Sequence, residues 1–291
     1  MSNCNTCNNY PSNVYNMILI IVIIVTVIYS TSSKAKTLKC SASLPLIQHT
    51  PKESWCRDPD IWTNLGFLAV GVVSVYKGTK TKTKTSKCHS KPLLAMGVAL
   101  IVLFMGSTWF HVESSRSHRP TTSRRVELGL VADRLGMAAS FAMAFGMVVH
   151  MVLLKKKKKT NRSSPDDVDF PWELTIIAWV VLSLSVFRCN SPLGSQAWPA
   201  LRISFILCIL IWWCTTLEFD PWIGSVVGCS VLADSISHIF PTLDRAIFNK
   251  SGMTGHSWKH LLYAISILLL VIRYSAVIQK KKKKEEIRKK T

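Results

Sequence analysis

Long apolar segments separated by short polar ones dominate the chain. Seven of them have the length and composition of membrane-spanning helices, since a span needs about 20 apolar residues. They cover residues 61–76, 92–111, 126–154, 172–187, 199–217, 222–240 and 256–278. Aromatic residues stand at several ends, as Trp62 and Tyr76 do, where their rings favour the membrane–water interface. The pattern predicts an all-α integral membrane protein built as a seven-helix bundle.

An eighth apolar run, Met17 to Tyr29, stands apart near the N-terminus. Its length matches the apolar region of a signal peptide, and the Ser and Thr residues after it could form a cleavage region. A signal peptide normally has basic residues before its apolar region, but no Lys or Arg precedes this run, which favours a retained extra helix instead. Both alternatives stay open. We therefore divide the chain into an N-terminal segment (1–60), a seven-span domain (61–278) and a basic tail (279–291).

The composition is both apolar and basic, with 48% hydrophobic residues and a formal net charge of +20. Three bursts, within residues 77–91, 155–162 and 280–290, hold 20 of the 36 Lys and Arg residues. The loops that alternate with them hold only 7, so the positive-inside rule places the bursts and the C-terminus in the cytosol. The bursts contain no aromatic residues, which argues against a nucleic-acid partner.

Ionisable side chains inside spans are costly and mark candidate functional sites. His111 ends the second span, and Asp133 lies about two turns into the third. His256 and His260 open the seventh span. On the predicted topology these four lie at one depth near the non-cytosolic face, whereas His150 lies near the cytosolic end of the third span.

The spacing of these residues favours a metal site. His256 and His260 are four residues apart and share a helix face, as Ser107 and His111 do. No Glu lies between His256 and His260, so the segment is not a zinc-protease helix. Three imidazoles and an open position are the arrangement of catalytic zinc. The sequence therefore predicts Zn²⁺ bound by His111, His256 and His260.

Asp234 and His238 lie near the outer end of the sixth span. A carboxylate often orients an imidazole that binds a metal, so this pair could support the site. It could equally be a polar pair that satisfies itself between helices, which is the interpretation we favour.

Several motifs resemble those of the alkaline ceramidase family. Residues 106–111, Gly-Ser-Thr-Trp-Phe-His, are similar to its GSxxFH motif, and Asp133 is similar to the Asp of its third span. Residues 256–260, His-Ser-Trp-Lys-His, resemble the motif that opens its seventh span. Residues 55–65 resemble the segment that leads into its first span. The resemblance covers about residues 53–265 and extends to a broader superfamily of seven-helix membrane hydrolases and receptors, with adiponectin-receptor-like proteins and GPI-lipid remodelling factors.

The resemblance implies zinc-dependent hydrolysis of ceramide, at its amide bond, to a sphingoid base and a fatty acid. It implies that His111, His256 and His260 bind zinc and that Ser107 and Asp133 are the catalytic partners. Asp133 would accept or relay a proton. Ser107 would donate a hydrogen bond to the oxyanion, although a small residue beside Gly106 also favours close helix packing. The partners implied are a ceramide-like membrane lipid and the bilayer.

Two departures from the family stand out. Animal ceramidases carry an acidic calcium site where this chain has residues 54–57, Ser-Trp-Cys-Arg, so we do not expect calcium. Asp58 and Asp60 remain nearby but are shifted in position. In addition, the loop between His111 and Asp133 is longer and more basic than in the family, which weakens the expectation for the substrate more than that for the metal.

Two other functions remain open from the sequence. One is a related hydrolase that acts on GPI or phospholipid esters. The other is a non-enzymatic receptor or structural protein, in which zinc only pins the second and seventh spans together. The C-terminal residues Lys289 and Lys290 resemble a retrieval signal, which favours the endoplasmic reticulum or Golgi. The sequence does not determine the oligomeric state.

Overall fold

The computed structural model describes residues 59–80, 87–116, 124–159, 168–187, 221–234 and 247–288. This part of the chain is all-helical, as predicted, and contains no strand. The apolar run 17–29, the predicted span 199–217 and His238 lie outside it. Its main helices are α2 (Pro59–Thr63), α3 (Leu65–Lys80), α4 (Lys87–Arg116), α5 (Arg124–Lys159), α6 (Trp172–Phe187), α8 (Pro221–Asp234) and α10 (Gly255–Arg288).

Three of these helices are long and apolar enough to cross a membrane. The apolar stretches are Ser90–Ser114 in α4, Arg124–Leu154 in α5 and Gly255–Lys280 in α10. Shorter apolar stretches lie in α6 and α8. These helices indicate association with a membrane, as the hydropathy predicted. Helix α10 continues past the predicted end of its span through the C-terminal lysines, because Lys and Glu are strong helix formers whatever their hydropathy.

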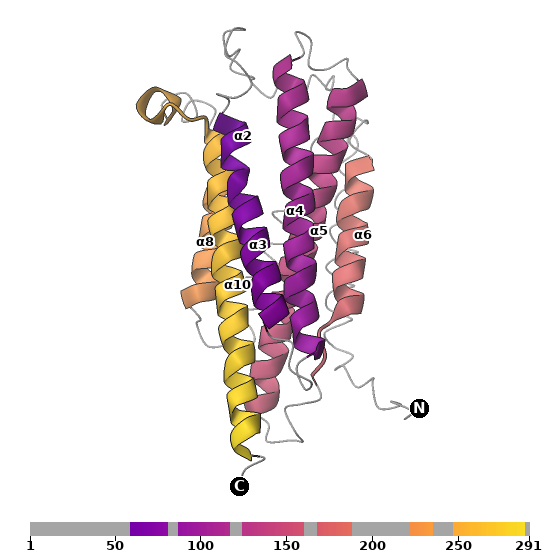
Figure 1. The fold of residues 1–291 in the computed structure, drawn as a ribbon, viewed down its shortest axis with the longest axis vertical. Coiled ribbons are helices and arrows are strands. Elements are labelled where there is room, and N and C mark those ends of the chain that lie inside the picture. Colours follow the sequence, from indigo (N-terminus) through magenta and orange to yellow (C-terminus); the bar gives the residue numbers. More distant parts are fainter. Residues whose placement is uncertain are drawn as a thin grey trace, which may run out of the picture.

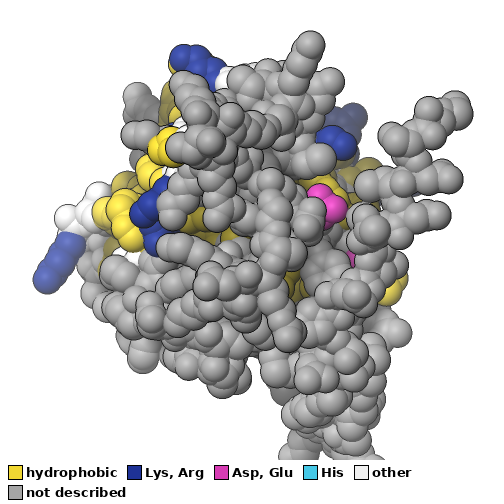
Figure 2. Space-filling view, turned by 90° about the horizontal axis from the view of Figure 1, so that it is seen from below, with side chains coloured by type: hydrophobic (Ala, Val, Ile, Leu, Met, Phe, Trp, Pro, Cys, Tyr) yellow, Lys and Arg dark blue, Asp and Glu magenta, His cyan; other side chains and the backbone are white. Residues whose placement is uncertain are grey.

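The helices form an elongated bundle in which α3, α5 and α10 run in one direction and α4 and α6 in the other (Figure 1). Helix α4 packs between α3 and α5, α6 packs on α5, and α10 packs against α3, α5 and α8. The C-terminal ends of α3, α5 and α10 therefore point to the same end of the bundle. Viewed from that end, Lys and Arg side chains lie at separate places on the periphery, with hydrophobic side chains between them (Figure 2).

Small residues allow close approach of the helices at the contacts of α4. A Cβ atom added at Gly97 would lie 2.8 Å from the carbonyl oxygen of Gly71 on α3. One added at Gly106 would lie 2.7 Å from the carbonyl carbon of Ala132 on α5, and 2.8 Å from the backbone nitrogen of Asp133. Glycine at such contacts is typical of helix packing in membranes. The contact at Gly106 also brings the backbone of Asp133 next to Ser107.

At the lysine-bearing end of the bundle, a buried polar cluster connects α5, α10 and the segment before α6. His150 on α5 and Tyr274 on α10 are fully buried, and His150 Nδ1 lies 2.7 Å from the Tyr274 hydroxyl. His150 Nε2 lies 3.3 Å from the carbonyl oxygen of Val168, just before α6. A carbonyl only accepts, so Nε2 carries the proton and Nδ1 accepts from Tyr274. Both ring nitrogens are satisfied, and His150 is a structural residue far from the other histidines.

We expect Gly106→Ala to lower stability, because backbone atoms of α5 cannot move aside for the new methyl group. Overpacking of this kind costs about 1–3 kcal/mol. Gly228→Ala on α8 is the matched control, since nothing lies within 4 Å of the added Cβ atom and Ala favours helix. Thermal unfolding of the purified variants in detergent measures both. Equal melting temperatures for Gly106→Ala and the wild type would contradict the close packing of α4 on α5.

Candidate metal centre

The three histidines predicted to bind a metal meet at the end of the bundle opposite the lysines. His111 lies near the C-terminal end of α4, and His256 and His260 occupy the first two turns of α10. One ligand atom from each lies within 4.8 Å of the others, and among the described residues these three form the group that could hold a metal ion. The ring centroid of His111 lies 5.2 Å from that of His256 and 5.4 Å from that of His260.

The hydrogen bonds of two imidazoles leave nitrogens available for a metal. His111 Nδ1 lies 3.9 Å from a carboxylate oxygen of Asp60, whereas its Nε2 is buried with no hydrogen-bond partner in the described part of the chain. His260 Nδ1 lies 3.4 Å from the hydroxyl of Thr63, which donates to the carbonyl oxygen of Asp60 at 3.3 Å. Thr63 can therefore accept from Nδ1, which leaves Nε2 with its lone pair. A buried nitrogen without a partner is costly, and a bound metal would satisfy it.

The start of α10 is fixed by local sequence. A short helical turn ends at Ser251, and Gly252 follows with a positive φ of 69°, which ends the turn and redirects the chain. Thr254 then caps α10, since its hydroxyl accepts a hydrogen bond from the backbone N–H of Ser257 at 3.1 Å. This cap determines where α10 begins, and therefore where its first two turns present His256 and His260.

Asp60 connects the cap of α10 to the end of α4 that carries His111. One of its carboxylate oxygens accepts hydrogen bonds from the hydroxyls of Thr254, at 3.1 Å, and Ser257. The other oxygen faces Nδ1 of His111. Burial works against ionisation of Asp60, but the nearby imidazoles and the bonded hydroxyls outweigh it and hold the pKa of this carboxyl group below its ordinary value. Asp60 is thus a carboxylate at neutral pH that orients His111, a common arrangement behind metal-binding histidines.

The two predicted catalytic residues lie beside the histidines. Ser107 is fully buried one turn before His111, and its hydroxyl lies beside the carboxylate of Asp133, close enough to stabilise it. Asp133 is buried on α5, opposite Gly106, and is close enough to His111 and Lys259 to interact with them electrostatically. The carboxylate of Asp133 is not part of the group of ligand atoms within 4.8 Å. The described side chains therefore offer three ligands and leave a position open, as in catalytic zinc sites.

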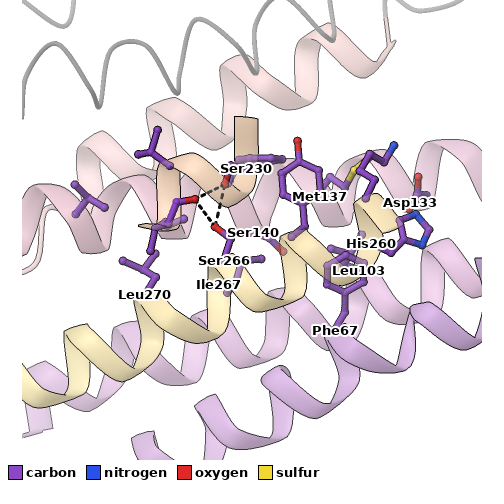
Figure 3. Close-up of a pocket in the computed structure, with 17 residues that line it drawn as sticks. Phe67, Leu103, Asp133, Met137, Ser140, Ser230, His260, Ser266, Ile267 and Leu270 are labelled. Carbon is purple, nitrogen blue, oxygen red and sulfur yellow. Dashed lines mark hydrogen bonds between the residues drawn. The ribbon is translucent and has the colours of Figure 1, made fainter. Parts of the chain in front are cut away.

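A cavity runs from this site into the bundle between α5, α8 and α10 (Figure 3). Asp133, Lys259 and His260 line one end, and the remainder is largely apolar with a few serines. Ser230 and Ser266 lie on its wall and bond each other at 2.9 Å, which ties α8 to α10. From His260 to Leu270 the cavity follows α10 for about 15 Å, close to half the thickness of a bilayer's hydrocarbon core.

Roles for Asp60, Thr63 and Lys259 do not follow from the sequence pattern. Asp60 precedes the predicted first span on the same side of the membrane as the histidines, and that placement was the available signal. Lys259 is buried inside α10, and an ionisable residue within a span is itself a sign of function. Asp234 ends α8, but its side chain and His238 lie outside the described residues. Both interpretations of this pair, a support for the metal site or the favoured polar pair between helices, therefore stay predictions.

Comparisons of the chain with protein-family models, with curated proteins and with solved structures found no match.

We expect Asp60→Asn to bind metal about 10–100-fold more weakly than the wild type, because the neutral amide loses the charge that orients His111. Metal content after dialysis against graded chelator concentrations measures this. Glu127→Gln, an exposed acid in the first turn of α5, is the matched control and should retain wild-type affinity. Unchanged affinity in Asp60→Asn would show that the carboxylate does not act on the metal ligands.

Proposed function

We propose that this chain is a zinc-dependent membrane amidase of the ceramidase type, which hydrolyses ceramide to a sphingoid base and a fatty acid. The observation that carries the proposal is the juxtaposition of three buried histidine ligands with a long apolar cavity. Metal ligands alone fit many functions, but an apolar cavity of one leaflet's length that opens beside them fits a lipid chain attached to the group that reacts.

The donor set supports zinc as the metal. Imidazole nitrogens suit zinc among the common divalent metals, and three of them are the ligands of several catalytic zinc sites. His111, His256 and His260 would hold the ion. When bound, zinc supplies a nucleophile from water near neutral pH and polarises the carbonyl group of the substrate.

The reaction proposed adds water across an amide bond. Oxygen from water bonds to the carbonyl carbon, the C–N bond breaks, and the products are a fatty acid carboxylate and a protonated amine. Asp133 would take a proton from the attacking water onto a carboxylate oxygen and deliver it to the leaving nitrogen. Ser107 would donate its hydroxyl hydrogen to the carbonyl oxygen as negative charge develops there. Lys259 balances the buried charge of Asp133.

The position of the site in the bundle suits a lipid substrate. The amide of a ceramide lies near the headgroup level, with its chains in the hydrocarbon. The histidines lie near the ends of apolar helices, at the level where Trp62 and Trp109 are exposed, as tryptophan often is at a membrane interface. The apolar end of the cavity reaches Val148 and Leu270, deeper in the bundle. A chain could thus lie in the cavity while its polar end meets the metal.

Metal analysis together with lipid hydrolysis tests the function. We expect His256→Ala to lose both zinc and activity, because two ligands compete poorly for zinc against water and chelators. Ser107→Ala and Asp133→Asn should keep zinc near one per chain while turnover falls, by about 10²–10³ for the serine. Ser275→Ala is the matched control, since this buried serine bonds its own helix at the other end of the bundle.

Three different results would contradict the metal site, the catalytic role of Asp133 and the amidase activity. Full zinc content in His256→Ala would refute the metal site. Zinc lost from Asp133→Asn would make Asp133 a ligand and favour a structural zinc pin. A wild-type protein that binds zinc and cleaves an ester lipid, but not the matched N-acyl lipid, would replace the amidase by an ester hydrolase.

We also propose that the chain spans the membrane several times, with its C-terminus in the cytosol of the endoplasmic reticulum or Golgi. The lysine-bearing ends of α3, α5 and α10 point the same way, which supports one basic face. We expect an epitope tag after Thr291 to react in cells whose plasma membrane alone is permeabilised, and to mark these organelles. A tag placed at residues 40–58 should react only after all membranes are opened. The reverse pattern would overturn the orientation.

A further inference from the structure

Asn64 is a buried amide with no partner for its side chain. It lies at the junction of α2 and α3 and is completely inaccessible to solvent. Neither Oδ1 nor Nδ2 has a hydrogen-bond partner in the described part of the chain, although its backbone carbonyl accepts from Phe67 at 2.9 Å. Buried amides nearly always have partners, so an unsatisfied one is a sign of a group that arrives from outside.

The packing of α3 on α4 indicates that Asn64 lies level with Ser107. Asn64 follows Asp60 by four residues, at the junction of α2 and α3, and Ser107 precedes His111 by four residues on α4. Helices α3 and α4 are antiparallel, and Asp60 faces His111. One turn deeper in the bundle, Asn64 is therefore expected to face Ser107.

The glycine contacts along the same two helices give the same register. The Cβ position of Gly71 meets Leu100, and that of Gly78 meets Leu94. Continuing this antiparallel register puts Asn64 opposite position 107 or 108. Of the two, only Ser107 shares the helix face of His111, since position 108 is turned about 100° away.

We propose that Asn64 is a further catalytic residue, whose Nδ2–H donates a hydrogen bond to the oxygen of the scissile carbonyl together with the hydroxyl of Ser107. Two neutral donors on neighbouring helices, one of them a single turn from His111, would form the arrangement that stabilises an oxyanion. The inference rests on the proposed hydrolase function, and it assigns to Asn64 the role of the second donor.

The unsatisfied amide of Asn64 leads to an unusual expectation for the stability of the fold. A residue retained for packing or for an internal hydrogen bond stabilises the fold, whereas an unsatisfied buried amide destabilises it. Replacement of Asn64 by Leu, which has a similar volume and no polar atoms, should therefore leave the melting temperature unchanged or raise it. Ser183→Ala on α6 is the matched control, because Ser183 also has a buried hydroxyl without a described partner but lies on a helix away from the histidines.

The kinetic test compares zinc-loaded wild type, Asn64→Leu and Ser183→Ala on an N-acyl sphingoid lipid. We expect kcat of Asn64→Leu to fall about 10²–10³-fold, with KM changed little and zinc content retained, because the donor acts mainly on the developing charge. Ser183→Ala should match the wild type. Wild-type kcat in Asn64→Leu would overturn the proposal. So would loss of zinc or a lowered melting temperature, which would make Asn64 a structural residue.

A second readout needs no turnover. An N-acyl lipid labelled with ¹³C at the carbonyl is bound to zinc-free protein, and its carbonyl stretch is measured by infrared difference spectroscopy. Loss of a donor should move the band to higher frequency in Asn64→Leu and leave it in place in Ser183→Ala. An unmoved band in Asn64→Leu would overturn the role of Asn64. A further outcome is that the band differs between the wild type and Asn64→Leu while the zinc-loaded wild type hydrolyses no lipid. In that case the proposed function fails, and the contact between Asn64 and the carbonyl group stands.

Discussion

The carboxylate of Asp60 fixes the relative positions of three helices. It belongs to α2, accepts hydrogen bonds from Thr254 and Ser257 at the start of α10, and faces His111 on α4. A buried charge requires such partners, and their directions are narrow. Apolar contacts alone would tolerate a shift of α10 along its neighbours, because they are not directional. The polar ties around Asp60 specify the one register in which His256 and His260 meet His111.

Glycine contacts supply the complementary constraint of distance. At Gly106 the backbone of α4 approaches that of α5 at Ala132 and Asp133, closer than any larger residue would permit. Ser107 and Asp133 are thereby brought beside the histidines from two different helices. Small residues set how near the helices lie, and hydrogen bonds set which residues face each other. Both are needed, because a site of this kind depends on distances that are shorter than one helical turn.

The sequence predicts some of these features well and others not at all. The helical class and the convergence of His111, His256 and His260 follow from hydropathy and from spacing within single helices. Hydropathy does not show the break at Asn64, nor the continuation of α10 through its lysines, which depends on helix propensity. The roles of Asp60 and Lys259 depend on contacts between helices far apart in the chain. Such contacts follow from packing register, which no pattern within one helix encodes.

The distribution of satisfied and unsatisfied polar groups distinguishes between the functions considered. At the lysine-bearing end and along the cavity, the buried polar side chains of His150, Tyr274, Ser230 and Ser266 all have partners. Towards the metal centre, His111 Nε2 and the Asn64 amide lack hydrogen-bond partners in the described residues. Such groups also occur elsewhere, because the buried hydroxyls of Thr108 on α4 and Ser183 on α6 lack a hydrogen bond in the described residues as well.

A zinc ion that only pinned two helices together would satisfy His111 Nε2. It would not account for Ser107 beside the ligands, for the unsatisfied amide of Asn64 or for the apolar cavity. A lipid with a carbonyl group at its polar end would satisfy the remaining donors and fill the cavity at once. Unsatisfied polar groups lower stability, and natural proteins tolerate that cost mainly at functional sites. The unsatisfied Asn64 amide and His111 Nε2, together with the apolar cavity, therefore favour the proposed hydrolase over a structural metal site.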